Sequence, residues 1–446
     1  MIPLDAILLR LGQPPRRRKA RWLHDGLAAM LADDQFAAGE HIPGSRQLAR
    51  ALTLSRGTVT EALDLLVSEG LLDAEPRRGH IVPARTRTAA RRPHHADVAA
   101  PTHSPGVGDL SLFPRTDWLR SLRHALSTMP DGDLGYPSPA GDPGLRGALA
   151  GYLARTRGAV VDPGRVVIVA GSAQALAVLA DLGRAESLVS WTLEKPHPPG
   201  MSDLLRRHGA AIRTLPVDAD GIVLGNLPEP GFVLVTPANQ APTGVLLAPE
   251  RRRALIAAAA SAGVFIVEDD YDGDLPLARH RIGVLQAAAP ESVFLLGSVS
   301  KSLAPGLRLG WVVVPEGWEH QFASERAFAD LGSPMIDQAA LAHFIESGAY
   351  DRHLRRVRKV YAERREALTD ALRQMGFELA DRSTAGLHVF IRCSEAAGRR
   401  IAPAVTAHDV PAQVVPGEPS GVVLGCATVR PRQARRVAAT AADARQ

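Results

Sequence analysis

Lysine is rare in this chain, and one lysine stands where a reactive amine would be useful. Arginine supplies nearly all of the positive charge, and the lysines are only Lys19, Lys195, Lys301 and Lys359. Lys301 lies in the stretch GSVSKSLAPGLRLGW, between two serines and behind an apolar run. A partly buried lysine can lose its proton and act as a nucleophile, whereas arginine stays protonated. The pattern therefore favours a lysine amine that reacts with an aldehyde.

The side chains around this lysine suit a phosphate group. Ser298 and Ser300 flank the lysine, and Arg308 follows in the same stretch. Hydroxyl and guanidinium groups donate the hydrogen bonds that phosphate oxygens accept. An amine beside phosphate ligands indicates a cofactor with both an aldehyde and a phosphate, and pyridoxal phosphate is the obvious candidate. The alternative is a strand-end lysine among solvated serines, with no cofactor.

Two further motifs supply groups that such a cofactor needs. Asp269 follows the buried run GVFIVE, and a fixed carboxylate keeps a pyridine nitrogen protonated. Tyr271, two residues later, can hydrogen-bond the ring oxygen. Gly171 and Ser172 open a helix after the strand RVVIVA, so that backbone N–H groups and the helix dipole face an anion.

These polar clusters need a sheet that brings them together. From residue 109 onward, β-branched apolar strands alternate with alanine-rich helices, which predicts an α/β domain with a mostly parallel sheet and helices on both faces. Ligands bind at the carboxyl ends of the strands in such sheets. Each cluster follows a strand, so we expect the clusters to converge.

The first eighty residues predict a different kind of unit. In IPGSRQLARALTLSRGTVTEALDLLVSEGLLDAEPRRGHIV, Ser45 and Ser55 are expected to cap two short helices. The second helix buries apolar residues and exposes polar ones near its start, and two short strands then flank a basic turn at 76–79. This order predicts a winged helix-turn-helix. A small helical interaction module with a charged, solvated face is the alternative.

Composition indicates how the chain is divided. Its 446 residues are enough for two or three domains. Residues 83–108 are rich in arginine, histidine, proline and alanine and lack large apolar runs, which predicts an exposed, flexible basic linker. We therefore expect domains at residues 1–82 and 109–446, the second ending in a smaller α+β part over 343–446.

Cysteine spacing and hydropathy indicate the cellular compartment in which the protein works. Cys393 and Cys426 have neither metal-ligand nor disulfide spacing, so we expect no metal site and a reducing compartment. No apolar run has membrane-spanning length, and the basic cluster near the N-terminus follows the apolar stretch instead of preceding it, unlike a secretory signal. These features predict a cytoplasmic protein without a membrane partner.

Residues 18–83 resemble the winged helix-turn-helix of the GntR family. The quoted stretch matches the family core densely and in order, which implies binding to operator DNA. Gly57 stands where the family usually has a longer polar residue, so one base contact is expected to be absent. The expected DNA-binding residues are Arg46, Ser55, Arg56, Thr58, Thr60, Arg77, Arg78 and Gly79.

Residues 109–446 resemble the fold-type-I aminotransferases, and most closely the MocR/GabR-like regulators, which fuse a GntR-type domain to an aminotransferase-like domain. The resemblance lies in YPSPAGDPGLRGALAGYLARTRG, VTPANQAPTG, VEDDYDGDLP, GSVSKSLAPGLRLG and AGLHVFIR. It implies that Lys301 forms a Schiff base with pyridoxal phosphate, that Asp269 pairs with the pyridine nitrogen, and that Tyr271 contacts the ring oxygen. It also implies a homodimer, because Tyr136 matches a tyrosine that reaches the phosphate of the neighbouring subunit. The expected phosphate ligands within the chain are Gly171, Ser172, Ser298, Ser300 and Arg308.

Several positions depart from the aminotransferase pattern. Pro198 replaces the aromatic residue that stacks on the cofactor ring, with His197 as the nearest substitute. Ala241 replaces the asparagine of Asn-Pro-Thr-Gly, so Asn239 or Gln240 is expected to supply the amide. The stretch GEPSGVVLGCATVR lacks an arginine at its strand start, where active aminotransferases bind the substrate carboxylate.

The sequence therefore predicts a pyridoxal-phosphate-dependent regulator that binds DNA. Its aminotransferase-like domain would sense pyridoxal phosphate, or a small amine or amino acid effector, and we assign no residue a catalytic role. One alternative is a catalytically active aminotransferase that carries a DNA-binding domain. Another is a repressor whose pocket has lost the cofactor, although retention of Lys301 argues against it.

Overall fold

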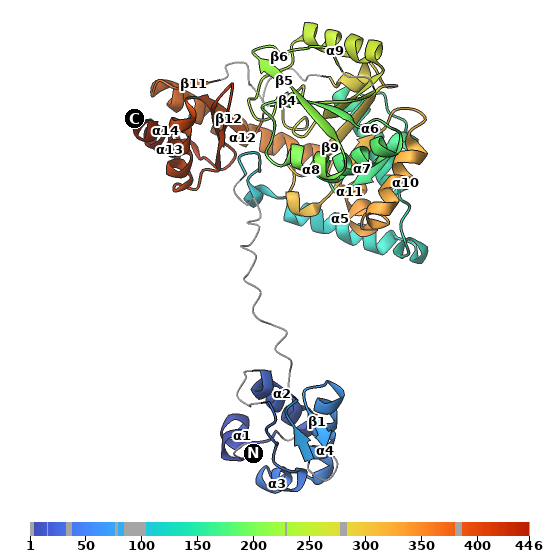
Figure 1. The fold of residues 1–446 in the computed structure, drawn as a ribbon, viewed down its shortest axis with the longest axis vertical. Coiled ribbons are helices and arrows are strands. Elements are labelled where there is room, and N and C mark those ends of the chain that lie inside the picture. Colours follow the sequence, from blue (N-terminus) through green and yellow to red (C-terminus); the bar gives the residue numbers. More distant parts are fainter. Residues whose placement is uncertain are drawn as a thin grey trace. The chain divides into compact units, whose positions relative to one another are not determined.

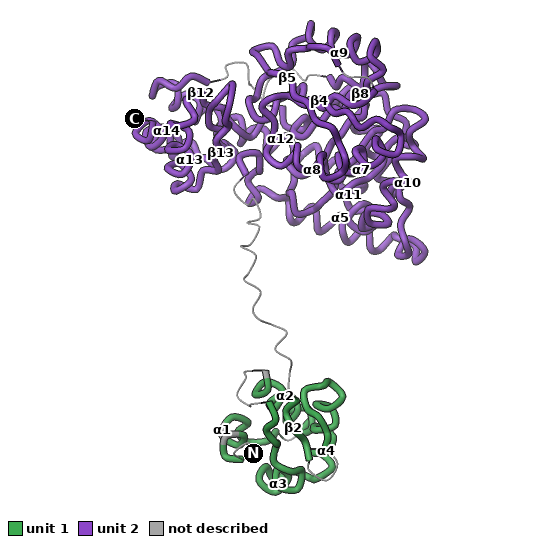
Figure 2. Tube along the Cα trace, viewed as in Figure 1, with its two compact units in different colours: residues 1–100 green, residues 101–446 purple. Residues whose placement is uncertain are grey.

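The computed structural model divides into two compact units, residues 1–100 and residues 101–446, called unit 1 and unit 2 below (Figure 2). Within the described residues, no helix is both long and apolar enough to cross a membrane. The described residues are 4–15, 17–32, 38–75, 79–83, 104–227, 230–276, 283–379 and 386–445.

Unit 1 combines helices with a two-stranded antiparallel sheet (Figure 1). Leu27, Leu48, Val59 and Leu63 are fully buried in its core, as expected when each helix turns one apolar stripe inward. The predicted winged helix-turn-helix is confirmed. Its elements are α1 (Leu4–Leu11), α2 (Lys19–Ala32), α3 (Ser45–Ala51), α4 (Arg56–Ser68), β1 (Asp73–Glu75) and β2 (Gly79–Ile81).

The two helices of the helix-turn-helix begin differently. Ser55 caps α4 as predicted, because its Oγ accepts a hydrogen bond from the Thr58 N–H at 3.1 Å. The same prediction for Ser45 is wrong. Gly44 occupies the N-cap of α3 and Ser45 is already the first helical residue, so its hydroxyl is not placed to cap the first turn.

Unit 2 is built on an eight-stranded sheet of order β3-β10-β9-β8-β7-β4-β5-β6. The strands from β9 to β5 run parallel, whereas β10 is antiparallel to both of its neighbours and β6 forms an antiparallel pair with β5. The predicted α/β fold is confirmed, with a mixed sheet. The strands are β3 (Val166–Val169), β4 (Ser190–Lys195), β5 (Ala211–Asp218), β6 (Gly221–Ile222), β7 (Gly231–Val235), β8 (Val264–Asp269), β9 (Val293–Ser298) and β10 (Gly310–Val313).

Helices cover both faces of this sheet (Figure 1). Along β3, Val166 and Ile168 enter one apolar cluster while Val167 and Val169 enter another, because successive side chains of a strand point to opposite faces. The helices are α5 (Arg115–Thr128), α6 (Pro143–Arg157), α7 (Ser172–Ala185), α8 (Met201–Arg207), α9 (Pro249–Ala262), α10 (Glu319–Asp330) and α11 (Met335–Glu346).

A smaller antiparallel sheet of order β11-β12-β14-β13 completes unit 2. One of its faces packs Val389 and Leu424 against the helices, and the opposite face carries the apolar group Phe390, Val415 and Val423. The elements are α12 (Ala349–Gln374), β11 (Glu378–Leu379), β12 (His388–Arg392), α13 (Glu395–Thr406), β13 (Ala412–Val415), β14 (Gly421–Gly425) and α14 (Pro431–Arg445).

Candidate functional site

The polar clusters of the sequence lie at one edge of the large sheet. Strand β3 ends shortly before Gly171, β7 before Asn239, β8 at Asp269 and β9 at Ser298. β7, β8 and β9 are parallel neighbours, and β3 shares their direction because β10 is antiparallel to both β3 and β9. The carboxyl ends of all four strands therefore meet at the same edge.

Lys301 lies near buried carboxylates at this edge. Burial lowers the pKa of Lys301, and the charges of Asp272 and Asp269 oppose that shift. Burial likewise raises the pKa of Asp269 to about 6, against the hydrogen bond from Ser172 and the charge of Lys301. In both groups, burial disfavours the charged form and shifts the pKa in the direction that favours the neutral form. The lysine amine is thereby closer to its nucleophilic state than a solvated lysine.

Asn239 is the amide that reaches the tyrosine of the pocket. Its Nδ2 donates to Tyr271 Oη at 2.9 Å and to Asp272 Oδ2 at 2.6 Å, while Tyr271 donates back to the Asn239 carbonyl at 2.9 Å. Gln240 instead donates to the Pro196 carbonyl at 2.8 Å. Of the two amides left open by the sequence, the structure brings Asn239 to Tyr271.

The start of α7 forms an open cradle with Arg308. A β-carbon on Gly171 would lie 3.3 Å from Arg308 Nη2, so any larger residue would fill the space between the helix and the guanidinium. Gly171 also has a φ of 103°, which favours glycine. Ser300 N–H donates to Ser298 Oγ at 3.4 Å, at the end of β9. A helix N-terminus facing an arginine fits a phosphate, and Lys301 fits an aldehyde, so these residues suit pyridoxal phosphate.

Two expected contributors lie apart from this group. Tyr136 is 92% exposed, so it does not enter the pocket of its own chain. The His197 ring is held by local contacts, to Ser202 Oγ in α8 at 2.8 Å and to the Pro198 carbonyl at 3.1 Å. The structure therefore gives no contact by which His197 would replace the missing stacking aromatic.

The start of β14 has no room for a carboxylate-binding arginine. A β-carbon on Gly421 would fall 2.1 Å from the Ile391 carbonyl oxygen and 2.7 Å from the Phe390 ring. Ser420 Oγ donates a hydrogen bond to the Cys393 backbone carbonyl at 2.7 Å, and Arg430 is exposed beyond the end of the strand. None of these residues is placed to form the bidentate pair that orients a carboxylate.

Sequence reasoning missed three residues near Lys301. Asp272 lies in the motif VEDDYDGD and His388 in AGLHVFIR, so both motifs were visible but these positions were not singled out. Burial lowers the pKa of His388 to about 3, with the charges of Arg365 and Lys301 acting in the same direction. Gly106 falls within the predicted linker, and no local pattern distinguishes it.

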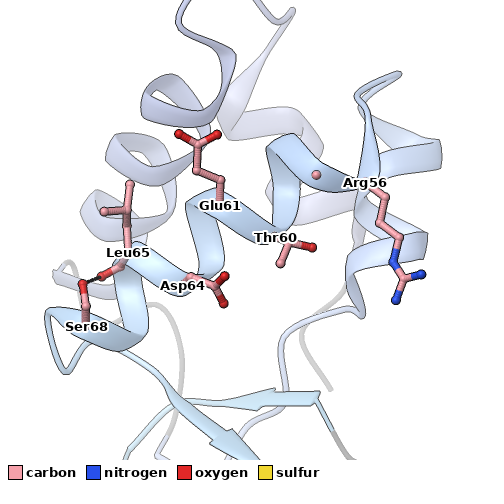
Figure 3. A pocket seen from close by; sticks show the side chains of 7 residues that line it. Arg56, Thr60, Glu61, Asp64, Leu65 and Ser68 are labelled. Atoms are coloured by element: carbon pink, nitrogen blue, oxygen red, sulfur yellow. Dashed lines mark hydrogen bonds between the residues drawn. The ribbon is translucent and has the colours of Figure 1, made fainter.

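The exposed face of α4 is the candidate DNA-reading surface. A shallow groove runs along it, with Arg56 at the amino-terminal end and two acidic side chains farther along (Figure 3). Thr58 Oγ1 lies 2.8 Å from Ser55 Oγ, so both hydroxyls belong to the cap, and Arg46 is exposed in the first turn of α3. The groove is lined by Arg56, Gly57, Thr60, Glu61, Asp64, Leu65 and Ser68.

The wing begins at the β1–β2 pair. Gly79 opens β2 opposite Glu75 and has a φ of 97°, a value that favours glycine. Arg77 and Arg78, also predicted to bind DNA, lie outside the described residues.

The two units match two known families. Residues 106–438 match the aminotransferase class I and II family, and residues 20–82 match the gntR family of bacterial regulatory proteins. The chain therefore belongs to the helix-turn-helix transcriptional regulators that join a GntR-type domain to an aminotransferase-like domain, as its sequence motifs predict. The aminotransferase family supports pyridoxal phosphate as the cofactor.

Named relatives share this organisation over most of their length. The probable rhizopine catabolism regulatory protein MocR of Rhizobium meliloti is 31% identical over 84% of this chain and 82% of its own. The pyridoxine biosynthesis transcriptional regulator PdxR of Corynebacterium glutamicum is 29% identical over 84% and 83%. The transcriptional regulator TauR of Rhodobacter capsulatus is 30% identical over 78% of each chain.

Solved aminotransferases share the fold of unit 2. Pyrococcus horikoshii kynurenine aminotransferase, solved with PMP, superposes with a TM-score of 0.68 at 21% identity, over 77% of this chain and 90% of its own. The α-aminoadipate aminotransferase LysN of Thermus thermophilus, solved with a phosphopyridoxyl-leucine adduct, gives 0.67 at 24% identity, over 77% and 91%.

Proposed function

We propose that this chain is a homodimeric, pyridoxal-phosphate-dependent transcriptional regulator of the cytoplasm. Unit 1 binds operator DNA, with Arg46, Arg56 and Thr58 at the contact. Unit 2 holds the cofactor at Lys301 and responds to pyridoxal phosphate itself, or to a small amine or amino acid. The domain boundaries near residues 82 and 109 are part of this proposal.

One contact carries the proposal: the segment 104–108, which the sequence assigned to the linker, lies against Lys301. A β-carbon on Gly106 would stand 3.1 Å from Lys301 Nζ, and one on Gly108 would stand 3.1 Å from the Lys301 carbonyl oxygen. A side chain at either position would crowd Lys301. Gly425 packs on the same segment, because its β-carbon would meet the Pro105 carbonyl at 3.0 Å.

Asp109 fastens the far end of this segment to α12. Its backbone N–H donates to Tyr361 Oη at 3.1 Å, and its carboxylate pairs with Arg364 Nη1 at 2.8 Å. The segment is thus anchored on one side, while in the other direction the chain continues toward unit 1. A change in the position of the Lys301 amine acts directly on this segment, which offers a route from the cofactor pocket to the connection with the DNA-binding unit.

The residues around Lys301 suit sensing better than turnover. When bound, pyridoxal phosphate supplies an aldehyde that condenses reversibly with a primary amine and releases water. Lys301 supplies such an amine, Asp269 is expected to hold a proton on the pyridine nitrogen, and Tyr271 is expected to contact the ring oxygen. Transamination also needs the substrate carboxylate held so that one C–H bond is oriented, and the start of β14 has no group for that purpose.

Exposed apolar side chains support the homodimer. Tyr136 is 92% and Phe328 is 86% exposed, and Leu134 and Leu331 are each 62% exposed. The two segments adjoin, because a β-carbon on Gly332 would meet Pro137 Cγ at 2.5 Å. Apolar patches of this kind mark interaction surfaces, and the sequence resemblance implies that the Tyr136 of a partner copy reaches the phosphate ligands.

Operator binding with and without amine tests the function. For the cofactor-loaded protein, we expect an effective amine to change operator affinity by about 5-fold or more. Gly106→Ala should weaken this coupling, whereas Gly151→Ala, on the exposed side of α6 with open space around it, should not. Steady formation of a keto acid from an amino acid at about 1 per second or faster would favour the alternative, an active aminotransferase.

A further inference from the structure

Two buried polar atoms near Lys301 have no hydrogen-bond partner. Within the described part of the chain, Asn239 Oδ1 and His388 Nε2 are both buried and unpaired, and the two side chains are 1% and 5% exposed overall. Buried polar atoms are nearly always paired with protein or water. Unpaired polar atoms beside a ligand pocket therefore indicate groups that hydrogen-bond to a bound ligand.

The two side chains belong to the same part of the pocket. The Pro242 carbonyl lies beside the His388 ring, and Pro242 is in the same loop as Asn239. The residues just before β12 touch Asn239 directly, because a β-carbon on Gly386 would fall 2.2 Å from Asn239 Nδ2. The charge of Lys301 also lowers the pKa of His388, so the two side chains are within electrostatic reach of each other.

Both side chains offer acceptors to a ligand. The two hydrogens of Asn239 Nδ2 are used by Tyr271 and Asp272, so its Oδ1 is left to accept. His388 is neutral in this environment, and a neutral imidazole has one N–H and one acceptor nitrogen. One ring nitrogen of His388 is therefore able to accept a hydrogen bond.

The surface beyond His388 does not suit a carboxylate. On the same face of the small sheet, Phe390, Val415 and Val423 form an apolar group. Arg392, at the far end of β12, is paired with Glu378 at 3.4 Å. On this face the apolar group offers a carboxylate no hydrogen-bond donor and Arg392 is already paired, which disfavours burying an ionised group there.

We propose that the pocket selects a primary amine that carries a second hydrogen-bond donor and no carboxylate, such as a diamine or an amino alcohol. His388 and Asn239 accept from that second donor, while the primary amine is directed to the Lys301 position. His388 is thus a specificity-determining residue. This inference rests on the proposed function, namely that an amine effector enters the pocket of the cofactor-loaded protein.

A matched set of small amines tests the selection. Propylamine, 3-amino-1-propanol, 1,3-diaminopropane and 3-aminopropanoic acid differ only in the group at one end. Each is titrated into the cofactor-loaded full-length chain, and the change in the cofactor absorption spectrum gives an apparent Kd. We expect the alcohol or the diamine to bind about 3- to 10-fold more tightly than propylamine, as one added hydrogen bond predicts, and the acid to bind most weakly.

Variants at position 388 separate this inference from the proposed function. His388→Phe should abolish the preference among the four amines, whereas His388→Gln, which keeps an acceptor, should retain part of it. Thermal unfolding of both variants without amine checks that each is folded. If all four amines bind wild type alike, if the acid binds best, or if the preference survives in His388→Phe, the inference is wrong while the proposed function stands. If wild type shows no cofactor band with pyridoxal phosphate, both are wrong.

Discussion

Ser172 Oγ donates a hydrogen bond to Asp269 Oδ1 at 3.2 Å and so joins the first turn of α7 to the end of β8. The same turn begins at Gly171, which lies against Arg308. One hydrogen bond therefore joins the group suited to a pyridine nitrogen to the turn that is suited to a phosphate.

Replacement of Asp269 should change how stability depends on pH. Burial raises its pKa from 3.8 to about 6, so the ionised carboxyl destabilises the fold, and this cost grows as pH rises from about 4 through 6. Without cofactor, Asp269→Asn should gain stability relative to wild type, by roughly 3 kcal/mol at most above pH 7 and by less at pH 5. Urea unfolding at both pH values measures the difference. Asp203→Asn, at an exposed position, is the control and should show no such trend.

Replacement of Lys301 should remove the covalent attachment of the cofactor. Lys301→Ala is expected to lose the near-visible absorption band of lysine-bound pyridoxal phosphate, because Lys301 is the lysine whose charge interacts with Asp269 and Asp272. Lys359→Ala, on the exposed side of α12, should keep the band. Absorption spectra before and after borohydride reduction make the comparison. A band that persists in Lys301→Ala would contradict the assignment.

Replacement of Arg56 should reduce sequence-specific DNA binding. Its guanidinium lies at the amino-terminal end of the exposed α4 groove, where recognition helices contact base edges. We expect Arg56→Ala to weaken operator binding by about 1–3 kcal/mol. The control variant, Arg21→Ala at an exposed position of α2, should have a smaller effect. Titrations against operator and random DNA measure both. An equal loss on the two DNAs would mean that Arg56 contacts only the phosphate backbone.

His24 should make the DNA-binding unit more stable in mild acid. Its Nδ1 lies 2.8 Å from Asp25 and its Nε2 lies 2.9 Å from Glu69, and the hydrogen bond with Asp25 is the largest cause of a raised His24 pKa. Because the folded value exceeds the unfolded value, this stabilisation is complete below about pH 6.5 and is lost as pH rises through the folded pKa. His24→Gln should therefore cost more stability at pH 5.5 than at pH 8.5. Chemical unfolding of the two proteins checks this, with exposed His320→Gln as the control.

Local patterns in the sequence were sufficient for the elements and for the residues at their ends. The strand Val166–Val169, the glycine at 171 and the helix that follows are adjacent in the chain, so periodicity and turn chemistry predict them without tertiary information. The cap at Ser55 was predictable for the same reason. Ser45 was not, because a shift of one residue in a helix start moves a hydroxyl out of the capping position.

The motifs also indicated which chemistry Lys301, Asp269 and Tyr271 suit, since side-chain type alone limits what an amine, a carboxylate and a phenol can do. Only the tertiary structure decided between Asn239 and Gln240, because neighbouring residues in a loop point in different directions and the packing around Tyr271 selects one of them. Only packing of distant segments brings Gly106 against Lys301 and His388 within electrostatic reach of it. Contacts of that kind leave no periodic trace in the sequence, because they depend on how separate elements pack and not on the spacing of residues along any one of them.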